Sequence, residues 1–477
     1  MNKEQKKNIN GIGYRIFKQY VHLYHDTIYY RKTYTVNSEN IPQDCPLMIV
    51  SNHQNSICDP LALLFTLKSR KKRKTRIISR ADVFNRPVAN KFLRWLGILP
   101  AYRIAVDGME YLENNIDTFE TAEEELLNNG TIIIYPEGKH QNKRWLGEFS
   151  SGYLRIVFEA AKKSNFEKEI FILPSCNHYS NYYDSKEDVL IKYGTPISIA
   201  PFYELYKTKP RTAQKQVNAL VREQVGELML NITDLENYKA FDYLRNTYGV
   251  KYAKEKGFNP EKLPEKLLSD KQLYTELENL KEKNNETLQN IYDNTRILEE
   301  KTKELNINDR NFDKKYYPWK MCFEGAVFVL LAPLFFLGCL PNVMVVFAPS
   351  SLTKKVKDPM LHSSIKFGIG VFFTIPVLYS LTFFLIWKVI TGSLIFSLIC
   401  LFFLPALGAF AVNYKQAFAH WQSEWRFYKL LGKGELFDLI SLRRNTYQLL
   451  DNLLGTRFKI LYSSGRSSEN KVLRRAN

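Results

Sequence analysis

The sequence predicts an α/β domain with a mixed, mostly parallel sheet flanked by helices, followed by a helical insertion and C-terminal membrane helices. Three observations lead to this prediction. Short β-prone runs alternate with helical patterns up to residue 204, a stretch rich in Lys, Glu and Leu follows, and long apolar runs come last. Such alternation is typical of a sheet covered on both faces. A chain of 477 residues has room for two or three domains.

The first 31 residues predict an amphipathic N-terminal helix. Apolar and aromatic side chains recur at helical spacing across residues 12–31, with charged and polar residues between them. Such a helix packs on a core or lies in a membrane interface, and the pattern leaves both open. Residues 1–10 are polar and contain no apolar run of signal-peptide type, so we expect the domain that follows to stay in the cytoplasm.

The predicted α/β domain covers residues 32–204. Candidate strands are 48–51, 76–79, 131–135, 170–173 and 189–193, and candidate helices are 61–67, 85–96, 109–128 and 153–162. In a mostly parallel sheet, active residues gather in the loops that follow the carboxyl ends of the strands. We therefore expect the active residues in these loops.

The loop after the first candidate strand carries a histidine and a carboxylate. Residues 51–60 read Ser-Asn-His-Gln-Asn-Ser-Ile-Cys-Asp-Pro, and the proline opens the next helical run. A neutral imidazole abstracts a proton better when a carboxylate fixes its tautomer and stabilises the imidazolium. His53 and Asp59 are therefore candidates for a general base and its partner. A histidine near an aspartate is common in proteins, so this pair alone does not define an active site.

Three further blocks follow in order: Gly-Ile-Leu-Pro-Ala-Tyr-Arg at 97–103, Tyr-Pro-Glu-Gly at 135–138 and Ile-Leu-Pro at 172–174. Together with Asn52-His53 and Asp59, they resemble the four blocks of glycerolipid acyltransferases of the lysophosphatidic acid acyltransferase (PlsC-like) type, over about residues 10–205. The resemblance implies acyl transfer from a coenzyme A (CoA) or acyl carrier protein (ACP) thioester to a glycerophosphate-type hydroxyl. It also implies a phosphate-binding role for the second and third blocks and an acyl-chain pocket near the fourth.

Carried onto this sequence, the resemblance implies that His53 and Asp59 are catalytic. The substrate-binding residues that it implies are Asn52, Gly97, Arg103, Glu137, Gly138, Lys139 and Pro174. Their chemistry is suitable, because Arg binds phosphate through paired hydrogen bonds and Lys binds it as a point charge. Glu137 would hydrogen-bond a glycerol hydroxyl or orient a cation. We expect no metal and no bound cofactor, with acyl-CoA or acyl-ACP as the donor.

Two positions depart from the family pattern. The family usually places four residues between the histidine and the aspartate, whereas five stand between His53 and Asp59. A loop can absorb the extra residue. Lys139-His140 stands where the common form has Thr-Arg, so Lys139, His140 or Lys143 would contact the phosphate. Residues 177–183, which include three tyrosines, either line the mouth of the site or pack in the core.

Residues 205–317 predict a charged helical insertion. Leu277, Ile291 and Leu298 fit one heptad position, and Asn284 interrupts it. The pattern is typical of a weak coiled coil or of a solvated helical spacer. A coiled coil would make the protein a homo-oligomer through this insertion or provide a docking surface for a partner.

The membrane region is predicted over 318–414. The runs 325–352, 367–387 and 389–414 contain no charged residue and exceed the about 20 residues that a helix needs to cross a bilayer. Pro333 and Pro341 are expected to break the first run, which would then be a re-entrant or interfacial hairpin. The other two runs would form a spanning hairpin whose external turn is at Lys388. A basic helical tail, 415–477, would follow on the cytoplasmic side.

The net charge of +18 points to an anionic partner, either a membrane surface or a nucleic acid. Seven positive charges fall within residues 68–76, but no nucleic-acid recognition motif accompanies them, and the apolar runs favour an anionic membrane. The six cysteines show no paired metal-ligand spacing, which predicts reduced thiols.

The sequence therefore predicts an integral membrane enzyme with its catalytic domain on the cytoplasmic face. The predicted reaction transfers an acyl group to the free hydroxyl of lysophosphatidic acid and gives phosphatidic acid for phospholipid synthesis. Alternatives are a glycerol-3-phosphate or lyso-aminolipid acyltransferase of the same family, and a non-catalytic lipid-binding scaffold in the membrane.

Overall fold

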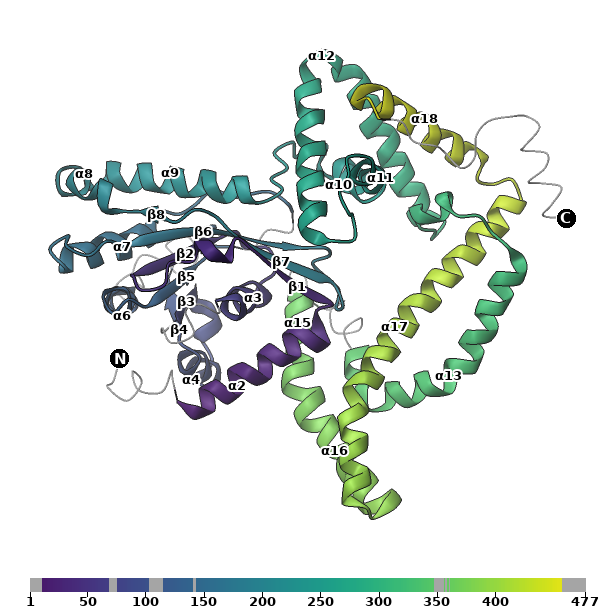
Figure 1. Ribbon diagram of the computed structural model, residues 1–477, viewed down its shortest axis with the longest axis horizontal. Helices are drawn as coiled ribbons and strands as arrows, with labels where there is room; N and C mark the ends of the chain where they lie inside the picture. Colours follow the sequence, from purple (N-terminus) through teal and green to yellow (C-terminus); the bar gives the residue numbers. More distant parts are fainter. Residues whose placement is uncertain are drawn as a thin grey trace. The chain divides into compact units, whose positions relative to one another are not determined.

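The computed structural model describes residues 11–67, 75–102, 115–139, 143–346, 356, 358–359 and 361–456. The chain divides into two compact units (Figure 1). The first contains Met1–Asn231 and Pro349–Val371, and the second contains Ile232–Ala348 and Phe372–Asn477. A segment from late in the sequence therefore belongs to the N-terminal unit.

Within the described residues, eight strands of the first unit form one sheet. They are β1 (Lys32–Val36), β2 (Leu47–Ser51), β3 (Thr75–Arg80), β4 (Ile98–Ala101), β5 (Thr131–Ile134), β6 (Phe171–Tyr179), β7 (Asp188–Tyr193) and β8 (Ile197–Ser198). Their order is β1-β7-β6-β2-β5-β3-β4, with β8 paired to β6. Strand β6 pairs antiparallel with β7 and β8, and the other pairs are parallel. The predicted mixed, mostly parallel sheet is confirmed.

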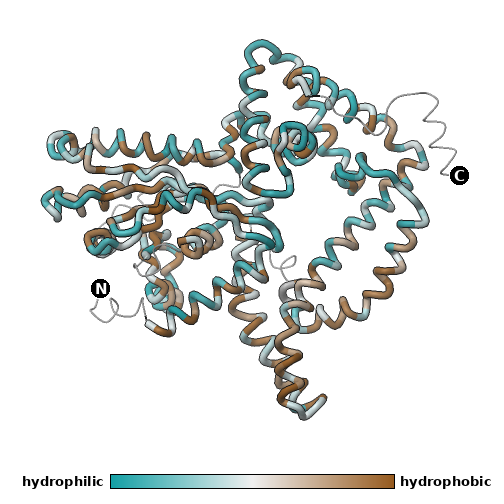
Figure 2. The backbone as a smooth tube through the Cα atoms, viewed as in Figure 1, coloured by the Kyte–Doolittle hydropathy of each residue, from teal (hydrophilic) through white to brown (hydrophobic). Residues whose placement is uncertain are grey.

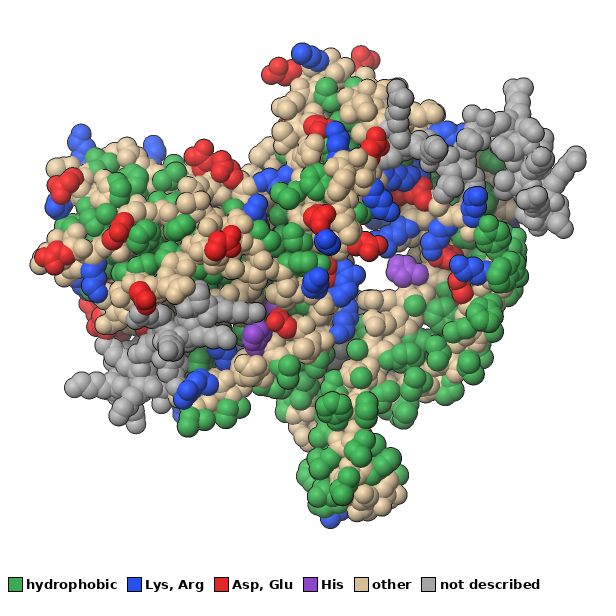
Figure 3. Space-filling model, viewed as in Figure 1, with side chains coloured by type: hydrophobic (Ala, Val, Ile, Leu, Met, Phe, Trp, Pro, Cys, Tyr) green, Lys and Arg blue, Asp and Glu red, His purple; other side chains and the backbone are tan. Residues whose placement is uncertain are grey.

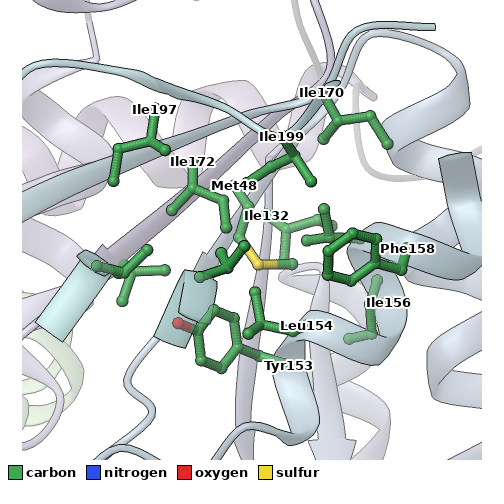
Figure 4. Packing of buried hydrophobic residues seen from close by; sticks show 14 of the residues in the cluster. Met48, Ile132, Tyr153, Leu154, Ile156, Phe158, Ile170, Ile172, Ile197 and Ile199 are labelled. Carbon is green, nitrogen blue, oxygen red and sulfur yellow. The ribbon is translucent and has the colours of Figure 1, made fainter. Parts of the chain in front are cut away.

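Helices cover both faces of this sheet. They are α3 (Cys58–Thr66), α4 (Pro87–Trp95), α6 (Asn115–Leu127), α7 (Gly152–Lys163), α8 (Tyr203–Thr208) and α9 (Pro210–Leu228). Every residue of β2 is buried, as expected for a central strand packed on both sides. Figure 4 shows one part of the core, where Met48 and Ile172 of the strands face Phe158 of α7.

The structure extends the first unit beyond the range in which the sequence placed it. Helix α9 buries Val217, Val221 and Val225 in the core of the α/β sheet. These three valines follow a helical spacing of four, so one face of α9 is apolar although the helix as a whole is charged. The unit therefore continues to Asn231, past the boundary predicted at residue 204.

The N-terminal segment is helical, as α2 (Ile12–Leu23) and the π-helical η2 (Tyr24–Tyr29). Tyr14 makes an edge contact with Trp95 of α4 at 5.9 Å between ring centroids, and Val21 is buried. On the other side, Ile12 and Ile16 are 70% and 66% exposed. One face of α2 therefore packs on the unit, and the other presents apolar side chains to the surroundings.

The second unit contains helices that the sequence assigned to the insertion and the tail. They are α10 (Tyr238–Asn246), α11 (Tyr248–Glu255), α12 (Leu263–Glu304), η8 (Asp309–Asp313) and α18 (Phe437–Leu454). Helix α12 has a non-helical residue at Asn284, the position where the heptad pattern is interrupted. Leu277, Ile291 and Leu298 are buried, and α12 packs on α10, α11 and α18 of the same chain. These apolar positions are thus filled without a second copy, while oligomerisation remains a prediction.

Three helices are long and apolar enough to cross a membrane: Pro318–Val343 within α13 (Pro318–Val346), Leu361–Thr391, and α17 (Leu394–Gly432). The second consists of α15 (Leu361–Ile369), η9 (Gly370–Tyr379), α16 (Ser380–Leu385) and η10 (Ile386–Thr391). Figure 2 shows these helices as hydrophobic segments, and Figure 3 shows hydrophobic side chains on their exposed surface. These helices indicate a membrane-embedded protein.

Two details of the membrane prediction were wrong. The chain stays helical through Pro333 and Pro341 as far as Val346, so the expected break is not present in the described part of this run. Within this helix, the side chain of Asn342 donates a hydrogen bond to the carbonyl of Gly338.

The turn between the last two helices also differs from the prediction. It lies at Gly392 instead of Lys388, because Gly392 adopts a positive φ of 65° and Ser393 caps α17. Lys388 lies within η10.

Candidate active site

His53 and Asp59 lie within hydrogen-bond distance after the carboxyl end of β2. The imidazole Nδ1 is 2.8 Å from Asp59 Oδ2. The Asp59 side chain is fully buried, whereas 18% of the His53 side chain is exposed. Because a carboxylate accepts, Nδ1 carries the proton in this pair and Nε2 is the nitrogen that can act as a base.

The loop between the two residues folds around the carboxylate. Asp59 lies in the first turn of α3, and its Oδ2 also accepts hydrogen bonds from the backbone N–H groups of Gln54 at 2.7 Å and Asn55 at 2.8 Å. Ser56 turns the chain with a positive φ of 40°, and the Cys58 N–H closes the turn on the Asn55 carbonyl. The five intervening residues are thus accommodated by a tight loop.

Tyr179 completes the surroundings of Asp59. Its hydroxyl donates to Asp59 Oδ1 at 2.7 Å from the last residue of β6. Burial, with the charge of Asp59 adding to it, raises the pKa of the Tyr179 hydroxyl well above 10, so the group is a neutral donor. The sequence left residues 177–183 open between lining the site and packing, and Tyr179 is a fully buried partner of the carboxylate.

Glu137 fixes the backbone of the histidine loop. Its Oε1 accepts the N–H of His53 at 2.8 Å, and its Oε2 accepts the N–H of Gly147 at 2.9 Å. Burial raises the pKa of this carboxyl, and the two backbone hydrogen bonds oppose that shift. The sequence assigned Glu137 to a substrate hydroxyl or a cation. In the structure both oxygens hold the protein backbone, because the third block lies directly beside the first.

The turn at 135–138 brings Tyr135 against the imidazole. The two rings stack with centroids 4.5 Å apart. Gly138 donates its N–H to the Tyr135 carbonyl and has a positive φ of 69°, which favours glycine at this position. Lys139 follows on the exposed side of the turn. Its position is compatible with a contact to an anionic group on a substrate.

Three residues predicted to bind substrate make structural contacts, and their binding of substrate stays a prediction. Asn52 is buried, donates to the Asn177 carbonyl and accepts the Asn177 N–H, so it ties β2 to β6. Pro174 is buried in β6 opposite Val50. Gly97 has a φ of 81° and ends helix α4 before β4, a conformation that favours glycine. Asn52 and Pro174 lie at the carboxyl end of β2, close to the site, whereas Gly97 lies at the amino end of β4.

Two predicted phosphate contacts, Arg103 and His140, lie outside the described residues. The described chain places another arginine near the loop, which the sequence analysis missed. Arg144 is buried and donates to the Tyr182 hydroxyl at 3.1 Å, and that hydroxyl donates to Gln54 Oε1 at 2.6 Å. This chain of hydrogen bonds links Arg144 to the loop that carries His53. No sequence signal singles out Arg144 among many basic residues.

A segment far along the sequence also supports this loop. In helix α15, Ser364 Oγ accepts the Ile57 N–H at 3.1 Å. The neighbouring Ser363 accepts the hydroxyl of Tyr29 through its carbonyl at 2.8 Å. Lys366 donates to the Tyr183 carbonyl. Helix α15 is therefore part of the same unit as the candidate site, which local sequence patterns do not reveal.

The described residues contain no group of three or more His, Cys, Asp or Glu side chains that could hold a metal ion. The arrangement around His53 is suited to proton transfer, with an oriented imidazole, a buried carboxylate and one partly exposed side of the ring.

The comparison with protein families agrees with this chemistry. Residues 32–177 match the family model described as Acyltransferase, a range that contains His53, Asp59 and Glu137. The crystal structure of the 1-acyl-sn-glycerophosphate (LPA) acyltransferase PlsC from Thermotoga maritima is a partial structural match, with 19% identity and a TM-score of 0.31. It covers 48% of this chain and 83% of that chain. No curated protein matches the chain in a sequence search. Over residues 32–177, the α/β domain of this membrane-embedded protein is thus similar to the acyltransferase family.

Proposed function

We propose that this protein transfers a fatty acyl group from acyl-CoA or acyl-ACP to the free hydroxyl of lysophosphatidic acid, giving phosphatidic acid for phospholipid synthesis. The observation that carries the proposal is the 2.8 Å contact between His53 Nδ1 and Asp59 Oδ2, at a histidine that is partly exposed. The match of residues 32–177 to the acyltransferase family model supports the reaction class. The acceptor and the donor are our inference.

In the proposed mechanism, His53 acts as the general base. Its Nε2 takes the proton of the acceptor hydroxyl, and the oxygen attacks the thioester carbonyl to form a tetrahedral intermediate. Collapse of this intermediate breaks the C–S bond, and the imidazolium returns the proton to the leaving thiolate. Asp59 stabilises the imidazolium between these steps, because its carboxylate is held by Tyr179 and two backbone N–H groups.

Acceptor binding is proposed to use the basic side chains near the turn at 135–138. Lys139 is exposed beside Glu137 and would contact the phosphate, and we retain Arg103 as a second candidate for this role. The exposed apolar side chains of Ile12 and Ile16 on α2 favour a lipid acceptor over a water-soluble one, because they suit a membrane interface. We place the catalytic unit on the cytoplasmic face.

The test compares acceptors and a histidine variant. Detergent-purified protein receives lysophosphatidic acid, glycerol-3-phosphate or a lyso-aminolipid, each with labelled acyl thioester. We expect product from lysophosphatidic acid and a rate loss of about 10² to 10⁴ in His53→Ala, the contribution of general-base catalysis. The matched control is His22→Ala, because His22 also contacts a carboxylate, Asp26 at 3.0 Å, but lies in α2.

The outcomes separate the alternatives. Product from glycerol-3-phosphate or the lyso-aminolipid only would replace the proposed acceptor. Full activity in His53→Ala would disprove the mechanism. Binding of lysophosphatidic acid without any product would favour the non-catalytic scaffold.

A further inference from the structure

A cavity of about 740 Å³ lies within the second unit, between the N-terminal half of α13 and the C-terminal half of α17. Its lining is both basic and apolar. The basic side chains are Arg310, Lys314, Lys315, Lys320 and His420. The apolar ones used here are Met321, Val327, Phe328, Ala417 and Trp421. Such a combination suits a ligand with a charged end and a hydrocarbon part.

The charge of the lining favours an anion. Four Lys and Arg side chains stand against two carboxylates, and one of these, Glu424, forms an ion pair with Lys314. Among the residues that the structure describes, the side chains of Arg310, Lys315 and Lys320 have no ion-pair or hydrogen-bond partner, and all three are exposed. Cationic groups that converge on a cavity without partners create a positive potential in it.

The cavity lies where both apolar runs end. Helix α13 has no charged residue after Glu324, and α17 has none before Lys415. Glu324 and Ala417 both line the cavity. In a bilayer, this level is the boundary between the hydrocarbon layer and the headgroups, where Lys, Arg and Trp side chains concentrate.

Direct contacts between α13 and α17, and between η8 and α17, fix the walls of the cavity. Trp421 Nε1 donates to the Met321 carbonyl at 3.0 Å, and Asn311 donates to the Ser423 carbonyl at 3.1 Å. A Cβ atom on Gly325 would lie 2.8 Å from Trp421 Cζ2, so the helices approach closely at this point. The cavity is therefore preformed, which lowers the cost of ordering a ligand.

We propose that this cavity binds one anionic phospholipid. The headgroup phosphate contacts Arg310, Lys315 and Lys320, and an acyl chain lies along Val327 and Phe328. A free phosphate shares the first contact but not the second. None of these residues belongs to the candidate active site, so the proposal does not depend on the proposed function.

The experiment measures lipid binding by the full-length protein in detergent, with native mass spectrometry and thermal shift as readouts. The probes are phosphatidylglycerol, phosphatidylcholine with the same chains, and inorganic phosphate. We expect phosphatidylglycerol to bind and stabilise the protein, and the triple variant Arg310→Gln, Lys315→Gln, Lys320→Gln to bind it roughly 10- to 100-fold more weakly, because each basic side chain near a membrane surface contributes to anionic-lipid binding.

Two controls make the result specific. The variant Lys239→Gln, Lys254→Gln, Lys283→Gln removes the same charge from exposed positions of the second unit outside the cavity, and should bind as the unmodified protein does. Ala417→Trp retains every charge but fills part of the cavity, and should also weaken binding.

Equal weakening in both triple variants would show that only net charge matters and would overturn the proposal. Equal stabilisation by inorganic phosphate and by phosphatidylglycerol would also overturn it, since the apolar lining would then have no role. Equal binding of phosphatidylcholine would contradict the proposed contact with an anionic headgroup.

Discussion

Asp59 receives hydrogen bonds from four groups, and three of them come from positions that a sequence motif can locate. His53 and the N–H groups of Gln54 and Asn55 lie within the motif, so the sequence could predict where the carboxylate would be held. The fourth donor, Tyr179, is on β6, and only the parallel pairing of β2 with β6 brings it near. Long-range sheet pairing is not readable from local patterns.

Tyr179→Phe removes one hydrogen bond to this carboxylate without changing the shape of the side chain. Hydrogen bonds to charged groups contribute about 1.5–3 kcal/mol, so the free energy of unfolding should fall by about that amount. Chemical denaturation of the detergent-solubilised protein measures it. Tyr153→Phe is the control, because its buried hydroxyl has no hydrogen-bond partner among the described residues, and it should cause no loss. Equal losses in both variants would contradict the assigned role of Tyr179.

The raised pKa of Glu137 predicts that the stability of the protein depends on pH. Burial raises its folded-state pKa above the ordinary value of 4.5. The contribution of Glu137 to stability is therefore fully present below pH 4.5 and is lost as the pH rises through the folded-state pKa. Glu137→Gln cannot titrate, so the stability of the unmodified protein relative to this variant should decrease over that range. Thermal unfolding at a series of pH values tests this, and a relative increase would refute the prediction.

At the scale of single elements, Asn342 joins three membrane helices. It lies in α13, donates to the Leu404 carbonyl of α17 at 3.3 Å, and accepts the hydroxyl of Tyr379 from η9 at 2.7 Å. The residue is buried, so these bonds form away from water. Buried polar contacts of this kind hold membrane helices in register. Local sequence patterns do not reveal this role of Asn342, because its partners lie on other helices.

Gly408 provides a test of this contact. A Cβ atom at Gly408 would lie 2.5 Å from Asn342 Oδ1, so Gly408→Ala should displace the asparagine and cost about 1–3 kcal/mol, as overpacking generally does. The apparent melting temperature in detergent should fall. Gly432→Ala is the matched control, because it is in the same helix and has nothing within 4 Å of the new atom. Alanine favours a helix more than glycine does, so Gly432→Ala should not lower the melting temperature, and a fall of the same size in both variants would show that the contact with Asn342 does not decide the effect.

The end of the apolar run does not mark the end of helix α17. The apolar run ends at Tyr414, but the helix continues to Gly432. Its 39 residues extend about 58 Å at about 1.5 Å per residue, nearly twice the about 30 Å of a hydrocarbon layer. The amino-acid composition of the chain changes at the membrane surface, whereas the backbone hydrogen bonds of the helix continue past it. The predicted tail therefore begins in the middle of an element.

For the whole molecule, connectivity limits how α13 can enter a membrane. Residues of α15 pack within the first unit, and no described helix between Asn231 and Pro318 is a candidate span. Both ends of the segment 318–361 therefore belong on one side. Residues 347–360 are fewer than the about 20 that a return crossing needs, so α13 should begin and end on the same side of the membrane.

Cysteine accessibility tests this topology. In a variant whose native cysteines are replaced by serine, Tyr317→Cys and Pro359→Cys should react with an impermeant thiol reagent from the same side of sealed vesicles. Ser393→Cys, at the turn before α17, should react from the opposite side. Labelling of positions 317 and 359 from opposite sides would mean that α13 crosses.

The position of α15 has a consequence for how the catalytic unit can be isolated. A shortened chain that stops at Asn231 would keep every strand of the sheet and the whole motif, yet it would lose Ser363, Ser364 and Phe367. The Ile57 N–H would be left without its acceptor, and the rings of Tyr24 and Tyr29 without the aromatic neighbour that they contact. Excision of the sheet domain alone should therefore expose aromatic surface and loosen the loop that holds His53.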